Sequence, residues 1–321
     1  MRFTLENAYL SVAVESRGAQ VASVVRKCDG VEHIWQADPA VWGYHAPVLF
    51  PYAGKLKDGR YTLDGAVYES PAQHGFARTL EHTCVQQDGA RLTLRLTQSE
   101  KTEKTFPFRF RFDSEFRLCG DMLAHTLRVV NMDEKEMPFG IGYHPAFALP
   151  FDGAHTAEDY ELRFSDLESP LCLSTQPRGL LSGSCYWLGT NLRTIPIDAK
   201  LFADDSHCMV NLRSKTLGVY EKDTGRAVVC EIGDFPYTLI WSKPGEPKFV
   251  CIEPWHSLPD AEDAGGDWRA KRAAAVLAPG ESWSTTLRTH FVRSRKKCSC
   301  LPHWQARFLF AFPRQGNNGN A

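Results

Sequence analysis

Two histidines and one glutamate stand in sequence contexts that suit proton chemistry. His74 precedes a glycine, His144 is flanked by glycines and a proline, and Glu253 ends an apolar run before Pro254 and Trp255. Glycine and proline weaken strand pairing and are tolerated where backbone approaches a ligand closely. Each residue alone favours an ordinary role, namely a turn histidine with satisfied hydrogen bonds or a strand-end carboxylate in an ion pair. Together the three could supply an acid, a base and a polar donor.

The opening of a sugar ring needs this combination. An acid protonates the ring oxygen and a base removes the proton from the C1 hydroxyl, so a histidine and a carboxylate suffice. Burial of Glu253 beside Trp255 would raise its pKa and make it a usable base. The reaction requires no metal, nucleotide or redox group, and we therefore expect no cofactor.

Further polar and aromatic residues near these segments are candidates for sugar binding. Lys55 lies in a rigid Pro- and Gly-containing loop and Arg78 offers a fork of hydrogen-bond donors. Tyr143 and Trp255 adjoin His144 and Glu253 and could form apolar platforms for a sugar. A lone lysine is more often solvated surface, and an aromatic ring more often packs in a core.

The elements that must position these residues read as β-strands. Hydrophobic residues alternate in 92–96 and 108–112, and a denser apolar run fills 122–130. Asp-Gly and Gly-Asp turn signals separate such runs. We expect an all-β fold, a large antiparallel β-sandwich with few short helices, the best helix candidate being 268–276 and the final strand 284–292.

Composition limits the function classes. The 321 residues carry 37 basic and 38 acidic side chains, a formal net charge of -1, which gives no electrostatic case for nucleic acid or a membrane surface. The ten cysteines show no regular framework, which favours reduced thiols. The sequence begins without a signal-peptide pattern and has no apolar run of the ~20 residues that span a bilayer. We therefore predict a cytoplasmic protein, a monomer or homodimer.

The character of the chain changes after residue 293. A basic stretch, an apolar patch around Phe308–Phe312 and a Gly- and Asn-rich end follow. We predict one β-sandwich domain over 1–293 and a poorly ordered tail over 294–321, with a partner-binding segment as the alternative.

Five ordered segments carry a resemblance to a known family: Phe50-Pro51 to Leu56, His74-Gly75-Phe76-Ala77-Arg78, Gly142-Tyr143-His144-Pro145-Ala146-Phe147, Asp234 to Ser242, and Cys251-Ile252-Glu253-Pro254-Trp255. In these segments the chain resembles the galactose mutarotase-like family, specifically its LacX-like aldose 1-epimerase branch. The resemblance covers residues 1–293 and implies an antiparallel β-sandwich with the sugar in an open cleft.

The resemblance also implies roles for individual residues. His144 matches the general acid, Glu253 the general base and His74 a second histidine that binds and polarises the sugar. Lys55 stands where the galactose enzymes carry an arginine, which changes donor geometry and places galactose preference in doubt. An acidic sugar-binding residue is expected near residues 201–205, and Asp205 is the choice.

Three functional readings remain open on the sequence. The first is an aldose 1-epimerase acting on a free hexose or related aldose, or in a variant on a hexose 6-phosphate held by Lys55 and Arg78. The second is a non-catalytic carbohydrate-binding or sensing protein on the same fold. The third and weakest is a metalloenzyme using His74, His144 and Glu253, which lack tight ligand spacing.

Overall fold

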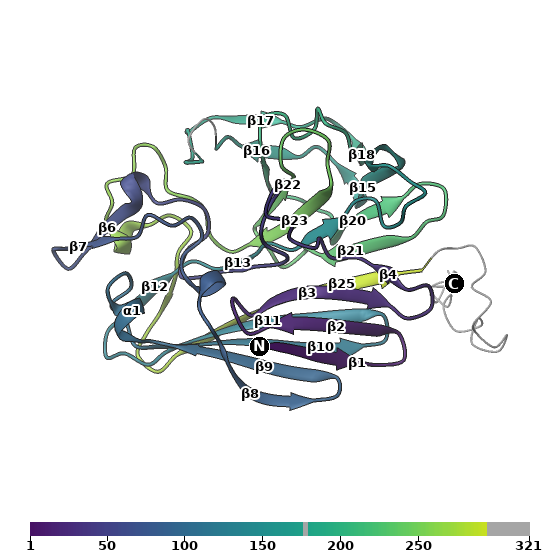
Figure 1. The fold of residues 1–321 in the computed structure, drawn as a ribbon. Coiled ribbons are helices and arrows are strands. Elements are labelled where there is room, and N and C mark those ends of the chain that lie inside the picture. The colour runs from purple at the N-terminus through teal and green to yellow at the C-terminus, as the bar shows by residue number, and fades with distance from the viewer. Residues whose placement is uncertain (176–178, 294–321) are drawn as a thin grey trace, which may run out of the picture.

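The computed structural model describes residues 1–175 and 179–293, and these form antiparallel sheets in layers (Figure 1). The predicted antiparallel β architecture is confirmed. The predicted tail, 294–321, lies outside the described residues. In the part of the chain that is described, no helix is long and apolar enough to cross a membrane.

The largest sheet has nine strands and contains most of the predicted alternating runs. The expected strand at 92–96 lies in β9, that at 122–130 in β11 and the last one in β25, whereas the run at 108–112 becomes strand only from Phe110. In spatial order the strands are β18 (Leu192–Pro196), β15 (Tyr160–Glu168), β20 (Thr216–Glu221), β21 (Ala227–Glu231), β25 (Ser282–Val292), β11 (Met122–Asn131), β10 (Phe110–Cys119), β9 (Arg91–Thr97) and β8 (Thr83–Asp88).

A second large sheet contains Glu253 in strand β23, and His144 and His74 lie in segments next to its strands. Its interior strand β23 is buried along its whole length, because elements cover both of its faces. The order is β17 (Cys185–Trp187), β16 (Leu171–Leu173), β19 (His207–Val210), β22 (Tyr237–Trp241), β23 (Phe249–Trp255), β13 (Gly142–Tyr143) and β5 (Val48–Leu49), and β14 (Ala146–Ala148) also pairs with β23.

Smaller sheets and short helices complete the described chain. One sheet has four strands, β1 (Arg2–Glu6), β2 (Leu10–Glu15), β3 (Gln20–Arg26) and β4 (Val31–Glu32); two have two strands each, β6 (Arg60–Leu63) with β7 (Ala66–Glu69) and β12 (Met137–Phe139) with β24 (Ala275–Leu277). The helices are α1 (Glu100–Glu103) and the 3₁₀ turns η1 (Lys57–Gly59), η2 (Ala77–Thr79), η3 (Ala157–Asp159) and η4 (Trp268–Ala270).

The helix expected over 268–276 is wrong beyond its first turn. Only η4 forms, and Ala275 already pairs in β24 with Phe139 of β12. Ala273 has a φ of 56°, which a right-handed helix cannot contain. Sheet pairing therefore overrides the helix propensity of the alanine run.

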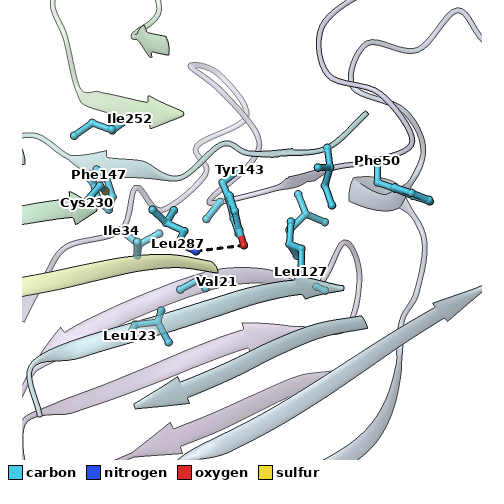
Figure 2. Close-up of a cluster of buried hydrophobic side chains, with 14 of the residues drawn as sticks. Val21, Ile34, Phe50, Leu123, Leu127, Tyr143, Phe147, Cys230, Ile252 and Leu287 are labelled. Carbon is cyan, nitrogen blue, oxygen red and sulfur yellow. Dashed lines mark hydrogen bonds between the residues drawn. The ribbon is translucent and has the colours of Figure 1, made fainter. Parts of the chain in front are cut away.

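Apolar side chains fill the space between the sheets. Figure 2 shows Tyr143 among them, with its hydroxyl facing the Leu287 amide. Tyr143 is 1% exposed, and Phe50 stacks on Phe112 with ring centroids 4.8 Å apart. No disulfide joins any two of the eight cysteines in the described residues.

Candidate active site

Strand register brings His144 and Glu253 together. Gly142 of β13 pairs with Trp255 of β23, and Ala146 of β14 pairs with Cys251 of the same strand. The register is the same on both sides of the break between β13 and β14, so His144 lies directly opposite Glu253. The Nε2 atom of His144 lies 3.3 Å from Oε2 of Glu253, and both side chains are buried.

Aromatic rings enclose His144. Trp42 stacks on the imidazole with centroids 5.0 Å apart and planes 23° apart, and Trp241 meets it edge-on at 5.7 Å. Phe249 in turn stacks on Trp42 at 5.4 Å. These rings exclude water from the imidazole, and the Nδ1 atom of His144 is buried without a hydrogen-bond partner.

A tight loop delivers His74 to the same place. Its ring meets that of His144 edge-on at 5.4 Å. The Gly54 amide donates to Nδ1 of His74 at 2.9 Å, and the His74 amide donates to the Gly54 carbonyl at 2.8 Å. Because Nδ1 accepts, the proton of the neutral ring must sit on Nε2, which makes His74 a standing donor.

Two glycines, one in this loop and one in strand β13, allow the backbone to lie close to neighbouring residues. Gly75 has a φ of 69°, and a Cβ atom there would stand 2.6 Å from the Phe50 carbonyl carbon and 2.7 Å from Cδ of Pro51. Gly142 has no room either, since a Cβ would lie 2.5 Å from Cδ1 of Trp255. Both backbone approaches require glycine.

Burial sets the charge state of the pair. It lowers the pKa of His144 to about 3, with the positive charge of Arg78 acting in the same direction. It raises the pKa of Glu253 well above its usual range, and the negative charge of Asp205 adds to this. Burial also holds the pKa of His74 well below its ordinary value. Burial therefore favours the uncharged form of both side chains, a protonated carboxyl on Glu253 and a neutral imidazole on His144.

Two of the predicted polar sugar-binding residues, Arg78 and Asp205, act electrostatically on this pair. Arg78 is half-buried, lies over the ring of Tyr44 at 4.1 Å, and its charge acts on His74, His144 and Glu253. The charge of Asp205 reaches Glu253, so both residues border the site.

The side chain of Lys55 is exposed. Its Cδ and Cε atoms lie 3.3 Å from the position of a Cβ built on Gly179. The Lys55 side chain therefore lies against the loop that contains Gly179.

Neither of the two predicted aromatic platforms offers an exposed ring face to a sugar. Tyr143 does not join the group, because neighbouring strand residues point to opposite faces and His144 takes the face towards Glu253. The Tyr143 hydroxyl donates to the carbonyls of His125 at 2.7 Å and Thr285 at 2.9 Å, within the core. Trp255 is 2% exposed and contacts the His74 ring edge-on at 5.6 Å, so it packs against His74.

Sequence reasoning missed Trp42 and Cys251. Trp42 lies in an irregular segment between β4 and β5, where no periodicity marks it. Cys251 had a signal, because it is two residues from Glu253 and must share its strand face. His144, Cys251 and Glu253 each offer a ligand atom within 4.8 Å of the others.

A second cluster of potential metal ligands is neutralised by the side chain of an arginine. Asp152, His155 and Glu221 also lie within 4.8 Å of one another. The guanidinium of Arg226 forms ion pairs with both Asp152 and Glu221, and His155 hydrogen-bonds Asp152 at 2.7 Å. This cluster is a satisfied ion-pair network.

The fold and the buried His–Glu pair define a β-sandwich protein with acid–base groups at one sheet. Residues 1–290 match the sequence profile of the aldose 1-epimerase family, and the chain belongs to this family. It is 31% identical to the plasmid form of protein LacX of Lactococcus lactis subsp. lactis over 292 residues, covering 87% of this chain and 95% of that protein. The expected LacX-like membership is confirmed.

Solved structures agree. A galactose mutarotase related enzyme from Lactobacillus acidophilus superposes with a TM-score of 0.87 at 31% identity, over 92% of this chain and 99% of that one. A galactose mutarotase-like protein from Lactobacillus casei gives 0.84 at 28% identity, over 91% and 100%. The fold is that of the galactose mutarotase-like proteins.

Proposed function

We propose that the protein is an aldose 1-epimerase that interconverts the α and β anomers of a hexose or related aldose. The observation that carries this proposal is the buried contact of 3.3 Å between Nε2 of His144 and Oε2 of Glu253, with His74 beside it. A pair that holds a single proton supplies an acid and a base at once. A protein that only binds sugar has no need of a buried histidine in contact with a buried glutamate.

The reaction follows from these groups. His144 donates a proton to the ring oxygen while Glu253 takes the proton of the C1 hydroxyl, and the bond from C1 to the ring oxygen breaks. The resulting aldehyde turns about its C1–C2 bond, and the roles reverse on closure, so no proton is gained or lost. This direction requires the proton of the free pair to move from Glu253 to His144, which the arriving sugar would favour by solvating the carboxylate.

The neighbouring residues bind and orient the sugar. His74 presents its Nε2 proton to a sugar oxygen, because the Gly54 amide occupies its other nitrogen. Arg78 and Asp205 act electrostatically on the pair and, together with Lys55, would bind the remaining hydroxyls. Arg78 also opposes the rise in the pKa of Glu253.

Anomer exchange tests the proposal. Freshly dissolved α-glucose and α-galactose are followed by polarimetry and by exchange NMR with wild type, His144→Gln and Glu253→Gln. Loss of a general acid or base should lower the catalysed rate by ~10²–10⁴-fold. Equal rates for wild type and His144→Gln would refute the acid assignment.

A second His–Glu pair provides a matched control. His290 and Glu231 lie 3.0 Å apart but are partly exposed, on strands of the nine-stranded sheet. His290→Gln and Glu231→Gln make the same chemical changes away from the site. Both should keep the wild-type exchange rate.

Two alternatives are separated by the same assays. A hexose-6-phosphate mutarotase is favoured by the positive charge of Arg78 at the pair, and faster exchange of glucose 6-phosphate than of glucose would establish it. A non-catalytic carbohydrate-binding or sensing protein would bind sugar without accelerating exchange.

We also propose a cytoplasmic protein, a monomer or homodimer whose partner is a small sugar. That no disulfide joins the described cysteines to one another supports a reducing compartment. Cell fractionation and light scattering of the purified protein test the two statements.

A further inference from the structure

We propose that His144, Cys251 and Glu253 form a binding site for a thiophilic divalent cation such as Zn²⁺, and that the bound ion inhibits the protein. The binding part stands on geometry alone. The inhibition part rests on the proposed function, because it requires His144 and Glu253 to be the proton-transfer groups.

The three side chains offer the ligand set that Zn²⁺ prefers. A thiolate, an imidazole and a carboxylate are each zinc ligands, and three protein ligands leave a fourth position of a tetrahedral ion for water, as in catalytic zinc sites. Their ligand atoms all lie within 4.8 Å of one another. The separation of 3.3 Å between Nε2 of His144 and Oε2 of Glu253 equals the distance of about 3.3 Å expected between two tetrahedral ligands with bonds of about 2.0 Å.

Strand geometry fixes this arrangement. Cys251 and Glu253 are two residues apart on β23 and share one face of the strand, and His144 crosses from the β13–β14 break. All three are buried, and Cys251 packs in a cluster with Ala146 and Phe249. Rigid, preformed ligands lower the cost of ordering a metal site.

Metal binding exchanges protons for the ion. The Cys251 thiol must lose its proton to ligate, and so must the carboxyl of Glu253, whereas neutral His144 ligates through its lone pair. Each Zn²⁺ therefore displaces up to two protons into solvent. The site should bind more tightly as the pH rises, until metal hydroxide competes.

The bound ion would stop catalysis by occupying the groups that carry the proton. The lone pair of His144 and the carboxylate of Glu253 would both point to the metal. The Cys251 thiol has no role in the proposed reaction. Its removal should therefore separate inhibition from activity.

Spectroscopy with Co²⁺ tests the site without reference to activity. Purified, reduced, chelator-treated protein is titrated with Co²⁺, and we expect one equivalent to give a thiolate-to-cobalt charge-transfer band together with visible bands of four-coordinate cobalt. Zn²⁺ should displace it. In Cys251→Ala the charge-transfer band should vanish and the affinity should fall at least about 10-fold.

Two further variants keep the test decisive. Cys230→Ala removes another fully buried thiol, in the core near Thr289, and should keep the band and the affinity. Cys251→Ser preserves the side-chain volume if the alanine variant does not fold, and it should also lack the band. A band that persists in either Cys251 variant, or that never appears in wild type, overturns the proposal.

Exchange kinetics complete the separation. Zn²⁺ should slow wild-type anomer exchange, and Cys251→Ala should keep its rate at Zn²⁺ concentrations about 10-fold higher. Cobalt binding through Cys251 without any anomer exchange would refute the proposed function and leave the metal site standing. Anomer exchange without a cobalt charge-transfer band would refute the metal site and leave the proposed function standing.

Discussion

Replacement of Gly75 by alanine tests how the backbone positions His74. The residue has a φ of 69°, which costs an alanine about 1–2 kcal/mol. The new Cβ would stand 2.6 Å from the Phe50 carbonyl carbon and 2.7 Å from Cδ of Pro51, so the Phe50 carbonyl must move. That carbonyl accepts from the amides of Phe76 at 3.0 Å and Ala77 at 3.1 Å.

The size of the effect follows from these contacts. Two buried hydrogen bonds that are lost or weakened cost about 1 kcal/mol each. Gly75→Ala should therefore lower the free energy of unfolding by about 3–4 kcal/mol. It should also displace the donor of His74 and weaken sugar binding.

Gly65→Ala provides the matched control. Gly65 has a φ of 82°, but nothing lies within 4 Å of its added Cβ, so only the conformational cost of about 1–2 kcal/mol remains. Urea unfolding of both variants measures the difference, which should be about 2 kcal/mol. Equal losses in the two variants would refute the argument that steric contact with Phe50 makes Gly75 necessary.

Three further outcomes are expected. Acidification from pH 6.5 to 4 should destabilise the protein by up to about 1.4 kcal/mol per pH unit for each histidine that is neutral in the native state but protonated when unfolded. Glu253, whose pKa is raised in the native state, acts in the opposite direction. Urea unfolding at pH 7 and pH 5 measures the change in the free energy of unfolding, and equal values at the two pH values contradict the prediction. The histidines with the clearest shifts are His33, His82 and His125, whose pKa values fall to about 4, 4 and 3. Tyr143→Phe should cost about 1–3 kcal/mol through the buried carbonyls that lose their donor, yet leave anomer exchange per folded molecule unchanged; a selective loss of sugar affinity would contradict the core location. Trp42→Ala should admit water to His144 and raise its pKa from about 3 towards 6.5, which NMR titration follows, and an unchanged pKa would show that Trp42 does not maintain the desolvation.

Local pattern predicted the strands and the motif residues but failed where pairing partners decide the structure. Alternation at 92–96 predicted β9 because side-chain period two is a property of the strand itself. The alanine-rich run after Trp268 has helix propensity, yet pairing of Ala275 with Phe139 makes β24, and that partner lies far away in the sequence. Propensity is a weak prior against such long-range pairing.

The assignment of site residues divides in the same way. The side of the sheet that Tyr143 occupies follows from its being a strand neighbour of His144, so the sequence held the information that only one of the two could face Glu253. Trp42 could not be foreseen, because its place above His144 depends on how an irregular segment folds back across the sheet.

The sequence by itself determined the β class, the proton-carrying residue types and the glycines that let backbone approach backbone. Only the tertiary structure determined that His144 and Glu253 lie in contact. Residues 144 and 253 are neighbours only because β13 and β14 pair with β23 in one register, and a shift by one residue would turn Glu253 to the other face. Their burial is likewise a property of the packed sheets and of Trp42, and it is burial that favours the uncharged forms of His144 and Glu253.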